Sequence, residues 1–78
     1  MNRQDLKSII LDAIGKPGDS LSIPKIARYI WENYEPQLKG SGEFFYTWQY
    51  DMRWAGDSLV RDGKLDKTAH RGMWMRLK

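Results

Sequence analysis

Residues 47–77 constrain the fold more than any other stretch, because they join a helical apolar stripe to a glycine and two short strand-like runs. The stripe repeats with the period of an α-helix and consists of Trp48, Met52, Ala55 and Leu59. Gly63 follows this stripe and suits the left-handed position just beyond the end of a helix. Two short apolar runs around a basic turn come next. The sequence therefore predicts a helix over about residues 47–62 and a β-hairpin over residues 64–77.

Two further amphipathic helices are predicted before this unit. The apolar positions of the first are Leu6, Ile9, Ile10, Ala13 and Ile14, and those of the second are Ile23, Ile26, Ala27, Ile30 and Tyr34. Asn2 can cap the first helix. We expect Pro36 to end the second, because the residue before a proline is pushed out of the α region. Leu21, which lies between two serines, suits a short strand that can pair with the hairpin.

The connection over residues 36–46 contains a glycine-rich loop tip and then three adjacent aromatic residues. The loop tip is Gly40-Ser41-Gly42, and the aromatic residues are Phe44, Phe45 and Tyr46. Three consecutive side chains cannot all lie on one face of a helix. Two alternatives stay open: either two of them pack and one is exposed, or they form a partner-binding patch.

The order of these elements is that of a winged helix-turn-helix. We predict an α+β fold of this kind, with three helices and a small antiparallel sheet in the order α-β-α-α-β-β, as one domain over residues 1–78. A chain this short buries only about 60–65% of the surface that its unfolded form exposes, so its core needs large side chains. Four Trp, four Tyr and two Phe supply them.

The positive charge of the chain is concentrated in its last part. Residues 1–46 carry six Lys or Arg and six Asp or Glu, whereas residues 47–78 carry seven Lys or Arg and four Asp. The whole net charge of +3 therefore belongs to the third helix and the hairpin. In a winged helix this unit is the one that turns toward DNA.

The third helix supplies the first group of candidate DNA-binding residues. Opposite its apolar stripe lie Tyr50, Arg53, Asp57 and Arg61. A helix face of this kind can enter the major groove, where the arginines can reach phosphates or guanine and the tyrosine a phosphate. The alternative is a solvated face on which Asp57 holds both arginines in ion pairs of about 0.2–0.5 kcal/mol each. Near DNA, Asp57 would weaken non-specific affinity.

The hairpin supplies the second group, which consists of Lys64, Lys67, His70 and Arg71. The wing tip spans residues 68–72, and the basic residues in and beside it can follow the DNA backbone or enter the minor groove, whose negative potential attracts cations. The alternative is a basic turn that only keeps the hairpin soluble. The two groups together predict binding to double-stranded DNA.

Trp54 lies more than 90° from the apolar stripe, although a fully exposed tryptophan is uncommon. We expect the hairpin to cover it, with Trp74 nearby. Stacking of Trp54 on a DNA base is the alternative.

The sequence lacks the residues that other classes of function require. Without cysteine and with His70 as the one histidine, no zinc site of Cys and His can form, and no nucleophile accompanies the histidine. The glycines match neither a dinucleotide-binding nor a phosphate-binding loop. We therefore expect no enzyme, no cofactor and no metal. No run of about 20 apolar residues and no signal-peptide pattern occurs, so we expect a cytoplasmic protein without a membrane partner.

The last third of the chain also resembles a known family. Arg53-Trp54-Ala55, Leu59, Gly63, Leu65, Arg71-Gly72-Met73-Trp74 and Leu77 are similar to the end of the N-terminal domain of Mrr-type restriction endonucleases. The resemblance covers roughly 25–30 residues and implies a DNA-binding winged-helix domain from a restriction-modification system. In that family a nuclease domain usually follows, and its paired acidic residues and lysine have no counterpart here. We expect a stand-alone binding module or the first domain of a longer chain.

A winged helix can also serve as a protein-interaction module. The modest net charge, Asp57 on the presumed recognition face and the surplus aromatic residues favour this alternative. The aromatic residues that would contact a protein partner are Trp31, Tyr34, Phe44, Phe45 and Tyr46. The sequence does not set the target site or the oligomeric state.

Overall fold

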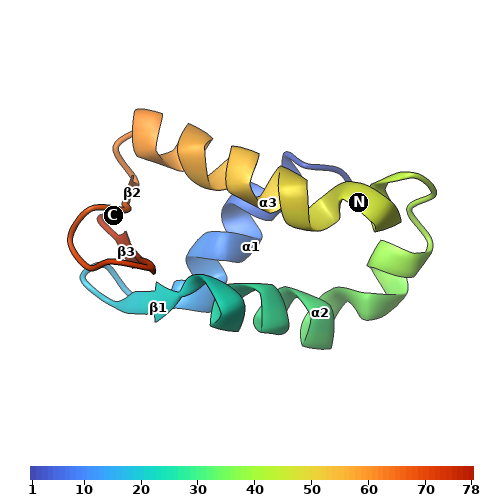
Figure 1. Cartoon of the computed structure of the whole chain (residues 1–78), viewed down its shortest axis with the longest axis horizontal. Helices are drawn as coiled ribbons and strands as arrows, with labels where there is room; N and C mark the ends of the chain where they lie inside the picture. The colour runs from blue at the N-terminus through green and yellow to red at the C-terminus, as the bar shows by residue number, and fades with distance from the viewer.

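The computed structural model describes all 78 residues and has three helices and a three-stranded antiparallel sheet (Figure 1). The elements are α1 (Asp5–Ile14), β1 (Ser20–Ser22), α2 (Ile23–Lys39), α3 (Phe44–Arg61), β2 (Leu65–Asp66) and β3 (Met73–Arg76). This order confirms the predicted α+β winged-helix arrangement. None of the three helices has the length and apolar content that crossing a bilayer requires.

Both ends of α1 are held by hydrogen bonds from outside the helix. The side-chain oxygen of Asn2 accepts hydrogen bonds from the backbone N–H groups of Gln4 and Asp5, at 2.9 and 3.4 Å, so Asn2 caps the turn that leads into α1, whereas Gln4 at the N-cap position of α1 makes no side-chain cap. At the other end, the Arg76 guanidinium donates to the carbonyl oxygens of Leu11 and Gly15. A cation at the negative end of the helix dipole stabilises α1 and attaches β3 to it.

The prediction that Pro36 ends the second helix is wrong. The backbone leaves helical geometry at Tyr34, with φ −130° and ψ 17°, and then resumes it, so that α2 continues to Lys39. Pro36 lacks an N–H and its ring conflicts with the carbonyl of residue 32, which explains a kink at this point. The helix continues because its last turn buries Leu38 completely.

α3 begins at Phe44, three residues earlier than predicted, because residues 44–46 form its first turn. Phe44 and Phe45 are partly buried against the core, whereas Tyr46 is exposed. The alternative in which two aromatic residues pack and one is exposed is therefore confirmed. The end of α3 is as predicted: Gly63 has φ +74°, and the N–H of Lys64 donates to the Leu59 carbonyl at 2.9 Å, as in a Schellman motif.

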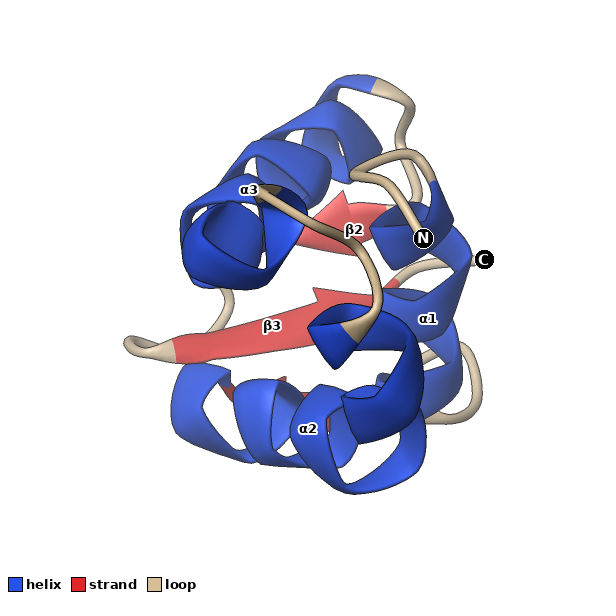
Figure 2. Cartoon of the chain, turned by 90° about the vertical axis from the view of Figure 1, so that its right-hand side faces the viewer, coloured by secondary structure: helices blue, strands red, loops and turns tan.

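The strand order in the sheet is β1-β3-β2, so the last strand is the central one. Leu21 pairs with Trp74, and Leu65 pairs with Arg76. The predicted short strand around Leu21 and its pairing with the hairpin are thus confirmed. Figure 2 shows the loop between β2 and β3 extending beyond the start of β3, in the position of a wing.

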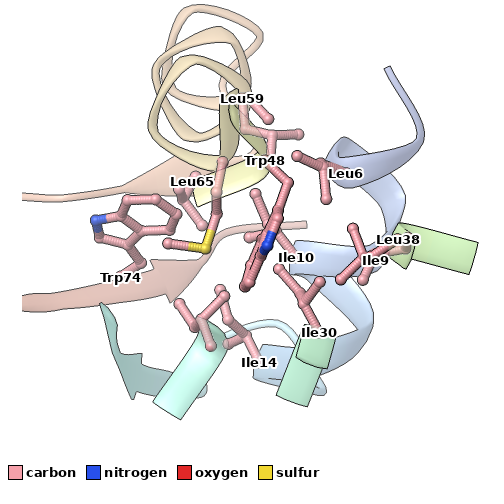
Figure 3. Close-up of a cluster of buried hydrophobic side chains, with 13 residues drawn as sticks. Leu6, Ile9, Ile10, Ile14, Ile30, Leu38, Trp48, Leu59, Leu65 and Trp74 are labelled. Carbon is pink, nitrogen blue, oxygen red and sulfur yellow. The ribbon is translucent and has the colours of Figure 1, made fainter. Parts of the chain in front are cut away.

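The core lies between the three helices and one face of the sheet (Figure 3). α1 contributes Leu6, Ile9, Ile10 and Ile14, α2 contributes Ile26, Ile30 and Leu38, α3 contributes Trp48, Met52, Ala55 and Leu59, and the sheet contributes Leu65 and Trp74. The predicted stripe of α3 is therefore its buried face. The opposite face of α3 is left for solvent or a ligand.

Candidate nucleic-acid interface

The outward face of α3 carries two arginines without acidic partners. Tyr50 is 78% exposed, and Arg53, Asp57 and Arg61 are exposed as well. None of the four ion pairs in the structure involves Arg53 or Arg61. The alternative in which Asp57 holds both arginines is therefore wrong.

Asp57 pairs instead with Lys67 of the hairpin, whose ammonium group hydrogen-bonds to its carboxylate. The Lys67 side chain is only 26% exposed, because its ammonium group also lies over the Trp74 ring, 4.7 Å from the centroid. Lys67 was predicted to contact DNA beside the wing tip, but it is turned inward to α3. Its charge neutralises the one acidic group of the α3 face.

Trp74 connects this ion pair to the core. Its ring is 3% exposed and packs directly on Gly56 of α3. Gly56, Trp74, Lys67 and Asp57 thus form a continuous series of contacts between α3 and the hairpin. The position of the wing relative to α3 is fixed by these contacts.

A cleft of about 440 Å³ lies where the start of α2, the middle of α3 and the start of β3 meet. Its lining residues are Ile23, Arg53, Asp57, Lys67, Gly72, Met73 and Trp74. The structure therefore brings Arg53 and Lys67 together, with the exposed Arg71 next to Gly72 at the rim. Arg61 lies two turns beyond Arg53 on the same face of α3.

The covering of Trp54 differs from the prediction. This tryptophan is half-buried, but the group over its ring is the guanidinium of Arg3, 4.4 Å from the centroid, and not the hairpin. The prediction is wrong because Trp74 is directed to Gly56 instead. Arg3 thereby adds a cation from the N-terminal segment beside Tyr50 and Arg53, which line a shallow pocket together with Trp54 and Asp57. Sequence reasoning missed Arg3, since no local pattern pairs residue 3 with residue 54.

The remaining hairpin residues of the candidate site, Lys64, His70 and Arg71, are exposed. The turn that leads to His70 and Arg71 is stabilised by Asp66, whose carboxylate accepts hydrogen bonds from the hydroxyl and the backbone N–H of Thr68, both at 2.7 Å. These two hydrogen bonds, led by that from the hydroxyl, hold the pKa of Asp66 below its ordinary value. Asp66 therefore stays ionised and keeps the first turn of the wing in place.

The five aromatic residues proposed for a protein partner separate into two sets. Trp31, Phe45 and Tyr46 line a groove between α2 and α3, whereas Tyr34 and Phe44 do not; all of them except Tyr46 also pack against the core. No group of three or more His, Asp or Glu side chains is placed to hold a metal ion. No family model, curated protein or solved structure matches the chain.

Proposed function

We propose that this chain is a non-catalytic winged-helix module that binds double-stranded DNA. In this proposal α3 enters the major groove and the hairpin over residues 64–77 follows the adjacent backbone. The observation that carries the proposal is the electrostatics of the outward face of α3. Arg53 and Arg61 are exposed and free of ion pairs, while Lys67 neutralises Asp57.

The other acidic groups of this part of the chain are also occupied. Asp62 pairs with Lys7 at 3.3 Å, Asp51 accepts a hydrogen bond from the Thr47 hydroxyl, and Asp66 binds Thr68. The carboxylates are thus engaged within the protein. The arginines of α3 and of the wing tip retain unused donors for phosphate oxygens.

Each residue of the site has a role in this proposal. Arg53 and Arg61 contact phosphates or the O6 and N7 acceptors of guanine, and Tyr50 donates to a phosphate. Lys64, His70 and Arg71 contact the DNA backbone beside the groove. Lys67 neutralises Asp57, so that this carboxylate does not repel the phosphates. Arg3 adds a phosphate contact beside Trp54.

The similarity of residues 53–77 to the N-terminal domain of Mrr-type restriction endonucleases supports a role in restriction-modification. That role belongs in the cytoplasm, where such systems meet foreign DNA. It requires neither a cofactor nor a catalytic residue in this domain.

A titration of a fluorescent duplex at low salt, followed by anisotropy, tests the proposal. With roughly five phosphate contacts, we expect the logarithm of the association constant to fall with log salt at a slope of about −4.5. Absence of binding to any duplex at low salt would reject the proposal. If amide NMR shifts on adding duplex leave residues 50–61 and 67–72 unmoved, the protein-interaction alternative is favoured instead.

A further inference from the structure

A groove runs between α2 and α3, and one end of it meets the wing, because Ile23 and Arg53 line both this end and the cleft beside the wing. Two adjoining cavities of about 610 and 630 Å³ form it, and both are lined by Pro24, Ala27 and Gln49. The remaining lining residues are Arg28, Trp31, Phe45, Tyr46 and Trp48 in one cavity and Ile23, Tyr50, Met52 and Arg53 in the other. We call this feature the α2–α3 groove.

The α2–α3 groove contains aromatic rings both in its interior and at its rim. Trp31 stacks on Trp48 with a centroid distance of 6.4 Å and an interplanar angle of 14°, and Phe45 lies 6.3 Å from Trp31. Tyr46 and Tyr50 stand at its rim, 84% and 78% exposed. Since they are four residues apart on α3, their rings leave the same side of the helix about 6 Å apart along its axis.

The charges of the α2–α3 groove have one sign. Arg28 and Arg53 are its only charged lining residues, and no carboxylate lines either cavity. Arg28 pairs with Glu32 at 2.7 Å, which compensates its charge, whereas Arg53 has no ion pair. Exposed planar rings next to an unpaired guanidinium are the combination that binds unpaired bases together with their phosphates.

We propose that the α2–α3 groove binds a short stretch of single-stranded nucleic acid. Bases stack on the rings of Tyr46 and Tyr50, and the phosphate between or beside them contacts Arg53. From Phe45 to Arg53 the groove follows nine residues of α3, or roughly 12 Å, which accommodates only a few nucleotides.

This binding site overlaps the duplex-binding face and extends beyond it. Tyr46 is 15 residues from Arg61, which places the two side chains roughly 22 Å apart along α3. Only Tyr50 and Arg53 belong to both. The α2–α3 groove therefore has its own diagnostic residue, Tyr46, while Arg61 and Arg71 are diagnostic of the duplex face.

Anisotropy titrations of the full chain with fluorescent oligothymidylate of about 12 nucleotides test the proposal. We expect Tyr46→Ala to weaken oligothymidylate binding by about five- to 150-fold, the range for loss of one stacking partner. Tyr46→Phe retains the ring and should bind like the wild type. Both substitutions leave the fold intact, since the side chain is almost fully exposed.

Titrations with a duplex, run in parallel, distinguish the α2–α3 groove from the duplex-binding face. Tyr46→Ala should leave duplex affinity within about twofold, because paired bases offer no face to a tyrosine. Arg61→Ala should weaken binding of the duplex and leave the affinity for oligothymidylate unchanged. A wild-type chain that binds the duplex but not oligothymidylate overturns the groove proposal alone. A chain that binds neither overturns both proposals.

Two further outcomes would overturn the groove proposal. The first is equal oligothymidylate affinity for Tyr46→Ala and the wild type, which would show that no base stacks there. The second is displacement of the oligonucleotide by polyglutamate of equal charge as effectively as by unlabelled oligothymidylate. That result would assign the α2–α3 groove to acidic protein segments.

Discussion

The indole of Trp74 occupies the space beside Gly56 in which any larger residue would place its β-carbon. Two atoms of the ring lie 2.6 and 2.8 Å from that position. No real β-carbon contact is this short, so the central strand and α3 approach each other as closely as they do only because residue 56 has no side chain. Neither partner has room to move, because Trp74 is buried and paired with Leu21 in the sheet.

Gly56→Ala is therefore expected to destabilise the protein. Alanine favours a helix over glycine by about 1 kcal/mol, but overpacking against a buried ring costs about 1–3 kcal/mol. We expect a net loss of about 1 kcal/mol in the free energy of unfolding, measured with urea. Gln49→Ala, an exposed change on the same helix, is the control and should stay within about 0.5 kcal/mol. A Gly56→Ala chain as stable as the wild type would contradict this packing.

Asp57→Asn is expected to increase affinity for duplex DNA. The substitution removes a negative charge from the α3 face and frees Lys67 to contact a phosphate. The slope of log affinity against log salt should steepen by about 0.9, the value for one further phosphate contact. A loss of affinity on preferred sequences would show instead that Asp57 accepts a hydrogen bond from a base.

Arg53→Ala and Arg71→Ala should have different consequences for sequence preference. If Arg53 contacts guanine, its loss costs about 1–3 kcal/mol on a preferred site and less on random DNA. Loss of a phosphate contact at Arg71 weakens both kinds of DNA alike and reduces the salt slope by about 1. Parallel titrations of the two variants with selected and random duplexes measure the difference. Identical losses of affinity for the two variants on both kinds of duplex would show that Arg53 does not contact a base.

Arg3→Ala should weaken duplex binding with little change in stability. A cation–π contact at an exposed site contributes about 0.5–1 kcal/mol, so the fold should remain intact by urea denaturation. Lys16→Ala is the matched control, because Lys16 lies in the turn after α1, at the opposite end of β3 from the wing tip. Equal duplex affinities for the two variants would exclude Arg3 from the interface.

Thr68→Val should raise the pKa of Asp66. The hydroxyl of Thr68 is the largest cause of the lowered pKa, while the backbone hydrogen bond remains in the variant. A carboxylate whose folded-state pKa is lower than its unfolded value stabilises the fold above the unfolded pKa. This contribution is lost as the pH falls through the folded pKa. Carboxyl-carbon NMR titration of both chains measures the shift, and an unchanged Asp66 would contradict the hydrogen bond.

The elements that sequence reasoning located are those whose signal is local. The stripe of Trp48, Met52 and Leu59 recurs at the helical period, and Gly63 follows one turn later, so the end of α3 could be predicted to within one residue. Pro36 was misjudged because the burial of Leu38 outweighs the local preference to stop. That burial depends on the packing of the whole domain.

The contacts of the candidate site were harder to foresee because they join distant parts of the chain. Periodicity places Asp57 four residues from Arg53 and Arg61, but its actual partner is Lys67 across the hairpin. In the same way, Arg3 covers Trp54, and Trp74 is directed to Gly56. Side-chain partners of this kind follow from the twist and position of the hairpin, which the sequence pattern alone does not define.

The central position of β3 has a consequence for synthesis of the protein. β3 follows every other element in the chain, yet both β1 and β2 need it as their hydrogen-bonding neighbour. On the ribosome, the helices can form as they emerge, but neither outer strand can pair until Arg76 has left the exit tunnel. The domain should therefore acquire its tertiary structure in one late step, and nascent chains that are arrested before β3 should remain sensitive to protease.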